Sequence, residues 1–160
     1  MNYTLLRGGA LIDGTGAASR TGSLLFDETQ IVEVGEPAPP PDCEIVDCTG
    51  LAVAPGFIDL HSHSDLQVLE NRPEKLLQGV TTEVVGNCGF SPYPCGPHSD
   101  ALREFANGIF RGSPEWAYPG VRDYLAELES HSQIVSVRSL IGHGSLRIGL
   151  FGNQIGRAHV

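Results

Sequence analysis

The chain has 160 residues, of which 41% are hydrophobic, and its formal net charge is −9 at pH 7. This length predicts roughly one domain, and the hydrophobic content is sufficient for a packed core, which excludes wholesale disorder. Lys and Arg form no cluster that would neutralise phosphates, and no run approaches the roughly 20 apolar residues of a membrane span, so we expect neither nucleic-acid binding nor membrane insertion.

Residues 1–54 favour a small β-module with glycine-rich turns. Short apolar runs separated by turn residues predict strands, and two neighbouring runs joined by Asp27-Glu28-Thr29 predict a hairpin. The proline-rich segment 36–41 cannot continue a ladder, because proline donates no hydrogen bond. The predicted strands are 3–6, 10–12, 24–26, 30–34, 44–47 and 51–53.

From Pro55 onward, strands alternate with helical segments, which is typical of βαβ units and a parallel sheet. In the last predicted helix, apolar residues recur at the spacing of one helix face. The predicted strands are 56–63, 80–87 and 134–141, and the predicted helices are 73–78, 100–107 and 121–130.

Three parallel strands do not close a sheet. The pattern predicts an α/β fold. If its sheet opens a TIM-type (β/α)8 barrel, which needs about 250 residues, that barrel is truncated after about its first three strands and is preceded by the small β-module. The last six residues equal one reading frame of a common sequencing-adapter read and are interpreted as an artefact. The expected domains are therefore 1–54, 55–154 and the terminal segment 155–160.

The pair His61-Ser62-His63 stands at the end of the first predicted barrel strand. Residues two apart share one side of a strand, roughly 6.6 Å apart, so two imidazoles there can converge on one metal ion. Asp59 shares their predicted side, where a buried carboxylate needs a partner such as a ligand imidazole or nearby backbone. The alternative is a pair of surface histidines beside a loop.

Four cysteines stand at positions 43, 48, 88 and 95. The N-terminus lacks the basic start and apolar run of a signal peptide, so we expect a cytoplasmic protein whose cysteines are free thiols or metal ligands. The spacings Cys43-x4-Cys48 and Cys88-x6-Cys95 are wider than the CxxC pairs of structural zinc sites, which disfavours a four-cysteine site.

Three motifs resemble one known family. Residues 54–65, APGFIDLHSHSD, resemble the PGxIDxHxH opening strand of the amidohydrolase superfamily. Residues 79–92, GVTTEVVGNCGFSP, are similar to the N-acyl-D-amino-acid deacylases (D-aminoacylases), as is IGHGSLR at 141–147. The resemblance covers about residues 3–154. It implies a zinc-dependent barrel carrying a small β-sandwich built from both ends of the chain.

The resemblance also implies a site. His61, His63 and Cys88 correspond to ligands of one or two Zn²⁺ ions, with cysteine in place of the carboxylated lysine of many relatives. Beside these ligands, Asp59 is a candidate for hydrogen bonding near the metal from its predicted side of the strand. His143 is a second candidate because it follows the third predicted strand, with a local hydrogen-bonding role as the alternative. If Cys88 faces inward, Glu83 faces the helix layer unless the strand is bulged near its end. The alternative for Cys88 is a buried structural thiol.

The implied activity is hydrolysis of a carbon–nitrogen bond other than a peptide bond. The substrate would be a small N-acyl-D-amino acid, which yields a carboxylate and a D-amino acid. Two histidine ligands and a general-base aspartate, expected on later strands, lie beyond this chain, so we expect the 160 residues alone to be inactive. The alternatives are a cyclic-amide hydrolase of the hydantoinase or dihydroorotase kind, and a non-catalytic amidohydrolase-like scaffold.

Overall fold

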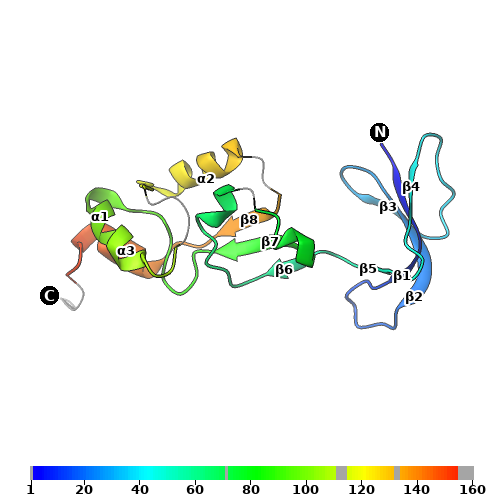
Figure 1. Ribbon diagram of the computed structural model, residues 1–160, viewed down its shortest axis with the longest axis horizontal. Helices are drawn as coiled ribbons and strands as arrows, with labels where there is room; N and C mark the ends of the chain where they lie inside the picture. Colours follow the sequence, from blue (N-terminus) through cyan, green and yellow to red (C-terminus); the bar gives the residue numbers. More distant parts are fainter. Residues whose placement is uncertain (1, 71, 111–114, 132–133, 155–160) are drawn as a thin grey trace. The chain divides into compact units, whose positions relative to one another are not determined.

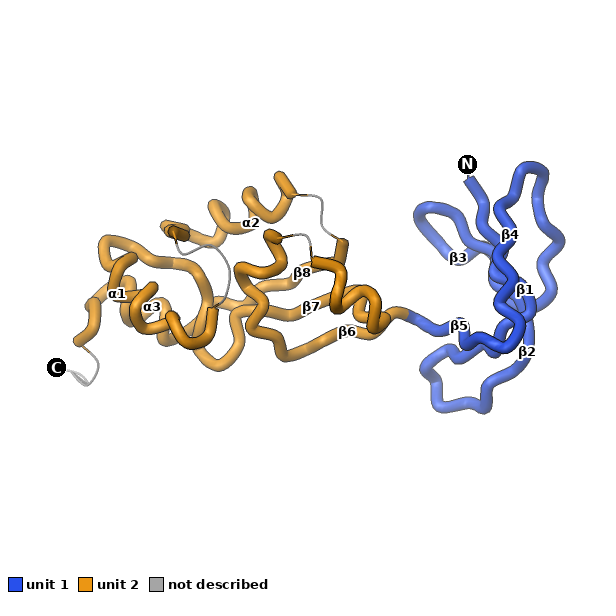
Figure 2. The backbone as a smooth tube through the Cα atoms, in the orientation of Figure 1, with its two compact units in different colours: residues 1–55 blue, residues 56–160 orange. Residues whose placement is uncertain are grey.

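The computed structural model of the chain describes residues 2–70, 72–110, 115–131 and 134–154. It divides into two compact units, Met1–Pro55 and Gly56–Val160 (Figure 2). Residues 155–160, interpreted above as an adapter artefact, lie outside the described residues. The two units are described separately below.

Unit 1 is a five-stranded sheet organised around one long strand (Figure 1). The hairpin predicted at 24–34 is confirmed, because β2 and β3 are paired antiparallel. The strands predicted at 3–6 and 10–12 are instead the single strand β1, in which one extra residue between Leu6 and Gly9 is absorbed as an irregularity near Gly8, at φ +72°. The strands are β1 (Thr4–Leu11), β2 (Arg20–Phe26), β3 (Ile31–Gly35), β4 (Glu44–Asp47) and β5 (Ala52–Val53).

Unit 2 contains a three-stranded parallel sheet in the order β6-β7-β8. Parallel strands need long crossover connections. Among the described residues, the connection between β7 and β8 contains two α-helices, whereas that between β6 and β7 contains only 3-10 turns, and the result is a mixed α/β fold. The helix predicted at 121–130 is confirmed. The helix predicted at 73–78 is only a single 3-10 turn, which Gly79 ends at φ +85°. The elements are β6 (Phe57–Asp59), η1 (Gln67–Glu70), η2 (Leu76–Gln78), β7 (Val80–Val85), η3 (Gly96–His98), α1 (Ser99–Ala106), α2 (Val121–Ser130), β8 (Ser136–Ser139) and α3 (His143–Phe151).

The core of unit 2 lies among the helices, the loops and one face of the sheet. Tyr124 of α2 is fully buried, and its ring centroid lies 5.3 Å from those of Tyr93 and Tyr118. Its hydroxyl donates a 2.6 Å hydrogen bond to the carbonyl oxygen of Asp65, which ties the helix layer to the segment after β6. Leu102 and Ile148 of the other two helices join the same cluster.

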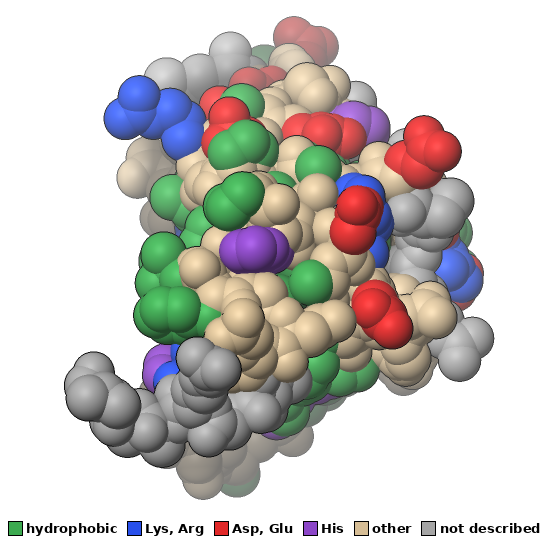
Figure 3. Space-filling model, turned by 90° about the vertical axis from the view of Figure 1, so that its left-hand side faces the viewer, with side chains coloured by type: hydrophobic (Ala, Val, Ile, Leu, Met, Phe, Trp, Pro, Cys, Tyr) green, Lys and Arg blue, Asp and Glu red, His purple; other side chains and the backbone are tan. Residues whose placement is uncertain are grey.

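Apolar side chains are also exposed in unit 2. Ile58 and Leu60, in and just after β6, are 60% and 71% exposed. Hydrophobic side chains also reach the surface at the end where α1 and α3 lie (Figure 3), and Leu150 and Phe151 of α3 are exposed. Within the described parts of the chain, no helix is both long and apolar enough to cross a bilayer.

Candidate metal centre

The loop after β7 carries Cys88 in an unusual backbone conformation. Gly86, Cys88 and Gly89 all have positive φ, at +79°, +56° and +82°. Glycine adopts this region freely, whereas a side chain such as that of cysteine is rarely found there, and such strain is concentrated at functional sites. The loop thus turns sharply at the end of the strand and leaves the Cys88 thiol exposed.

The segment after β6 runs beside this loop and is tied to it by hydrogen bonds. The Ser62 N–H donates to the Val84 carbonyl oxygen at 3.1 Å. The Asn87 side-chain amide donates to the carbonyl oxygens of Val84 and Ser62, at 2.8 and 3.3 Å. The Gly86 N–H donates to the Asp65 carboxylate at 2.8 Å. These bonds fix the two histidines relative to the cysteine.

His61, His63 and Cys88 consequently meet, with their potential ligand atoms within 4.8 Å of one another. The His61 Nε2 atom lies 3.1 Å from the Cys88 Sγ atom, and the two imidazole centroids are 5.5 Å apart. The buried Nδ1 atom of His63 has no hydrogen-bond partner among the described residues. Nitrogen and sulfur ligands of one tetrahedral zinc ion lie about 3.5 Å apart, and zinc favours this combination of imidazole and thiolate. The three residues therefore fit a zinc ion.

Asp59 has the expected partner in the nearby backbone, but its charge pairs with Lys75 rather than with a ligand imidazole. Strand β6 ends at Asp59, whose carboxylate accepts a hydrogen bond from the His61 N–H at 3.1 Å, so the alternation stops before the histidines. Asp59 is aligned with Glu83 across the sheet and forms a 2.5 Å ion pair with Lys75. It therefore contacts the backbone of His61, while its charge is directed toward Lys75.

His143 is the first residue of α3 and is exposed. It is not a member of the group of three converging ligand residues. The start of α3 nevertheless lies against the cysteine loop, because the Ser145 N–H donates to the Gly89 carbonyl oxygen at 3.2 Å. A Cβ atom at Gly142 would lie 2.5 Å from that same oxygen, so this close approach requires glycine.

The sequence analysis missed a buried polar cluster next to the histidine segment. Glu83, only 3% exposed, forms a 2.8 Å ion pair with Lys75. Burial raises the pKa of Glu83, but the hydrogen bonds from Lys75, Ser64 and Ser62 outweigh it, so the pKa lies below its usual value. Glu83 therefore stays charged at neutral pH. A glutamate inside an otherwise apolar and β-branched strand, VTTEVV, was the available signal.

Asp65 provides a prediction about stability and pH. Burial raises its pKa from 3.8 to about 7. Between these pH values the folded chain retains a proton that the unfolded chain has released, so this contribution to stability is complete below pH 3.8 and is lost as the pH rises toward 7. For the metal-free protein with a chelator present, we expect the free energy of unfolding of Asp65→Asn, relative to that of the parent, to rise by on the order of 3 kcal/mol as the pH goes from 4 to 7.5. Urea unfolding at a series of pH values measures this difference. The same pH dependence of the free energy of unfolding in both proteins would contradict the prediction.

Comparison with known proteins places these features in a family. Residues 44–157 match the family model of the amidohydrolase family. The chain is 38% identical over 159 residues to the N-acyl-D-aspartate deacylase of Alcaligenes xylosoxydans xylosoxydans, and the match covers 96% of this chain and 30% of that protein. A dihydroorotase of Geotalea daltonii matches over 62% of the chain, at 32% identity.

Solved structures agree with this relationship. The N-acyl-D-glutamate deacylase of Bordetella bronchiseptica, complexed with zinc and a phosphonate inhibitor, matches with a TM-score of 0.75 and 34% identity, over 91% of this chain and 30% of that one. A D-aminoacylase described by its binuclear metal centre matches with a TM-score of 0.73 and 34% identity, over 91% of this chain and 31% of that one. The chain thus spans about 30% of the length of the relatives it matches. It belongs to the amidohydrolase family.

Proposed function

We propose that the chain is the N-terminal part of a zinc-dependent deacylase that hydrolyses N-acyl-D-amino acids, with His61, His63 and Cys88 as ligands of one or two Zn²⁺ ions. The observation that carries the proposal is the convergence of these three side chains from two neighbouring loops. In this proposal, residues 1–54 contribute to a small β-sandwich and residues 55–154 open a (β/α)8 barrel. The parallel order β6-β7-β8 supports such an opening.

A zinc ion held by His61, His63 and Cys88 would polarise the amide carbonyl of the substrate and lower the pKa of a bound water molecule. The residues of this chain would hold the metal ion and orient its ligands. Cys88 contributes a thiolate, which the strained loop holds beside His61, and the hydrogen bond from the His61 N–H to Asp59 fixes the backbone of that histidine. The general base that takes the proton from water is expected on a later strand, outside these residues.

The names of the relatives support a linear N-acyl-D-amino acid as the small-molecule substrate. The match to a deacylase extends over nearly the whole chain, whereas the match to a dihydroorotase extends over less than two thirds of it. The cysteine in the GNCG segment agrees with this preference, because it replaces a carboxylated lysine in the expected site. A linear amide is therefore preferred to the cyclic alternative.

An assay of the full-length protein that carries this chain tests the proposal. We expect zinc-dependent release of free amino acid from N-acetyl-D-amino acids, and loss of this activity after chelation and dialysis, with recovery on zinc addition. The matched N-acetyl-L-amino acids serve as the stereochemical control. Turnover of hydantoin or dihydroorotate in their place would favour the cyclic-amide alternative. A protein that neither binds zinc nor turns over any of these amides would be the non-catalytic scaffold.

A further inference from the structure

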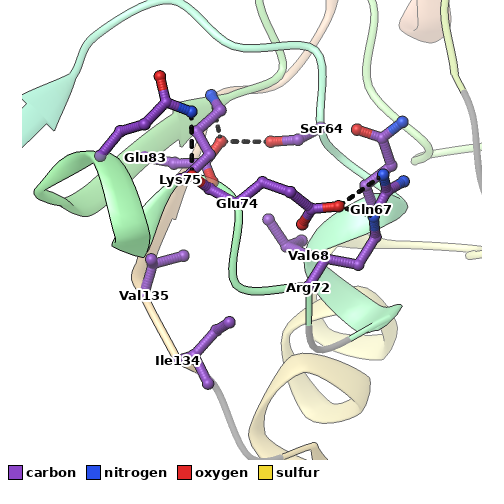
Figure 4. Close-up of a pocket in the computed structure, with 10 residues that line it drawn as sticks. Ser64, Gln67, Val68, Arg72, Glu74, Lys75, Glu83, Ile134 and Val135 are labelled. Carbon is purple, nitrogen blue, oxygen red and sulfur yellow. Dashed lines mark hydrogen bonds and ion pairs between the residues drawn. The ribbon is translucent and has the colours of Figure 1, made fainter.

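Glu83 binds the side chains that alternate with the two histidines. Its Oε2 atom accepts hydrogen bonds from the hydroxyl of Ser62, at 2.8 Å, and from the hydroxyl of Ser64. The same oxygen lies 2.8 Å from the Lys75 ammonium, which also donates to the Ser62 hydroxyl at 3.0 Å. The close-up in Figure 4 shows Glu83, Lys75 and Ser64 gathered at one side of a cavity of about 210 Å³.

Residues 61–64 alternate between histidine and serine, and the two serines and the two histidines have different surroundings. Ser62 and Ser64 are buried, and their hydroxyl oxygens lie 2.7 Å apart. His61 and His63 have their imidazoles together and near Cys88. Although β6 ends at Asp59, the serines bind Glu83 and the histidines lie near Cys88, so the two sets of side chains occupy different sides of the segment. Holding both serines on one buried carboxylate therefore fixes the rotation of the segment about its own axis, and with it the direction of both imidazoles.

Lys75 also connects Glu83 to the backbone of His61, through Asp59. It pairs with Asp59 at 2.5 Å as well as with Glu83, and Asp59 in turn accepts the His61 N–H at 3.1 Å. Glu83 is buried, and Lys75 and Asp59 are half-buried; a polar network in which the members have partners is rigid, because moving one member leaves others unsatisfied. The two carboxylates and one ammonium also carry a net charge of about −1, which favours a cation on the histidine side.

We propose that Glu83, together with Lys75, is a positioning residue that aims His61 and His63 at the metal through the hydroxyls of Ser62 and Ser64. This inference rests on the proposed zinc site. It assigns a role to four residues outside the ligand set. The contacts predict that removing the hydrogen bonds between the two serines and Glu83 changes metal affinity and coordination geometry, even though all three ligand residues remain present.

The discriminating variant is Ser62→Ala combined with Ser64→Ala. It removes both hydroxyls but leaves Glu83 paired with Lys75, so no buried charge loses its ionic partner. Glu83→Gln is the complementary variant, because glutamine keeps an acceptor oxygen for the serines and loses the charge. Glu74→Gln is the matched control: Glu74 lines the same cavity but pairs with the exposed Arg72.

Cobalt binding to the full-length protein is the readout, measured by competition with a chelator and by absorption spectra of the Co²⁺ form. We expect the double serine variant to bind Co²⁺ about 10–100-fold more weakly, with altered d–d bands, since changes behind metal ligands have effects of this size. Glu83→Gln is expected to lose less Co²⁺ affinity than the double serine variant. Glu74→Gln is expected to match the parent in Co²⁺ affinity and in spectrum. Circular dichroism melts of the metal-free proteins test whether each variant is folded.

The outcomes separate the two proposals. A folded double serine variant that binds Co²⁺ within about twofold of the parent, with the same spectrum, overturns the positioning role and leaves the zinc site standing. If the parent shows no thiolate-to-cobalt charge-transfer band, both proposals are overturned. A lower melting temperature with unchanged cobalt affinity assigns the serines to folding alone and overturns the positioning role.

Discussion

Replacing Cys88 by serine or alanine in the full-length protein is expected to reduce zinc affinity and amide hydrolysis by at least about 100-fold, more than loss of a residue behind the ligands costs. The reason is the donor itself: a hydroxyl is a far poorer ligand than a thiolate for zinc, and alanine offers none. Metal content after dialysis and turnover of an N-acetyl-D-amino acid measure the effect. Zinc should also protect the exposed Cys88 thiol from alkylation.

The backbone at Cys88 makes a third replacement informative. At φ +56°, a residue with a Cβ atom is strained by roughly 1–2 kcal/mol, a cost that glycine does not have. Glycine also loses more conformational freedom on folding, which offsets about 0.4–1 kcal/mol of that gain. We therefore expect Cys88→Gly to leave the metal-free protein as stable as the parent, or slightly more so, while abolishing zinc binding.

Cys43→Ser is the control for the cysteine series. Cys43 lies in unit 1, where its thiol donates a 3.3 Å hydrogen bond to the Glu44 carbonyl oxygen, a bond that serine retains. It is expected to match the parent in zinc content and turnover. Full zinc content and turnover in Cys88→Ala would remove Cys88 from the site and return it to the alternative of a structural thiol.

The sequence predicted the elements that depend on local pattern. The helix Val121–Ser130 has apolar residues at helical spacing and begins and ends as predicted. Strand β7 is β-branched apart from Glu83, and the structure has it two residues shorter than predicted, because the chain turns at Gly86. The helix His143–Phe151 was not predicted, because its first turn, HGSL, holds glycine and has no charged cap.

The candidate site was predictable only in part. The HxH spacing pointed to His61 and His63 as metal ligands, whereas Cys88 was added to the site only through the resemblance of the GNCG segment to the family. Asp59 has the nearby-backbone partner that was expected, the His61 N–H, but its ion pair with Lys75 was not expected, because the strand ends at Asp59 and its alternation does not extend to the histidines. The partnership of Glu83 with Ser62 and Ser64 joins residues about 20 positions apart, so no local pattern reveals it.

Gly86→Ala is expected to be the most destabilising single substitution in the cysteine loop. A Cβ atom at Gly86 would lie 2.1 Å from the Leu140 carbonyl oxygen and within 3 Å of two further backbone atoms of that residue. Backbone atoms cannot rotate away, and the Leu140 N–H is already bound to the Val85 carbonyl oxygen at 2.9 Å. The clash with Leu140 adds to the strain of a side chain at φ +79°, so we expect Gly86→Ala to lower the free energy of unfolding by more than about 4 kcal/mol.

Gly79→Ala separates the clash from the backbone conformation. Gly79 lies in the same unit with φ +85°, but a Cβ atom there would meet only the ring of Phe57, at 3.3 Å, which is 65% exposed and free to move. We therefore expect Gly79→Ala to cost only about 1–2 kcal/mol, the price of the left-handed conformation. Urea unfolding of both variants measures the difference. Equal losses would mean that the approach of Gly86 to Leu140 contributes nothing, and that the cysteine loop is not held in place by the end of β8.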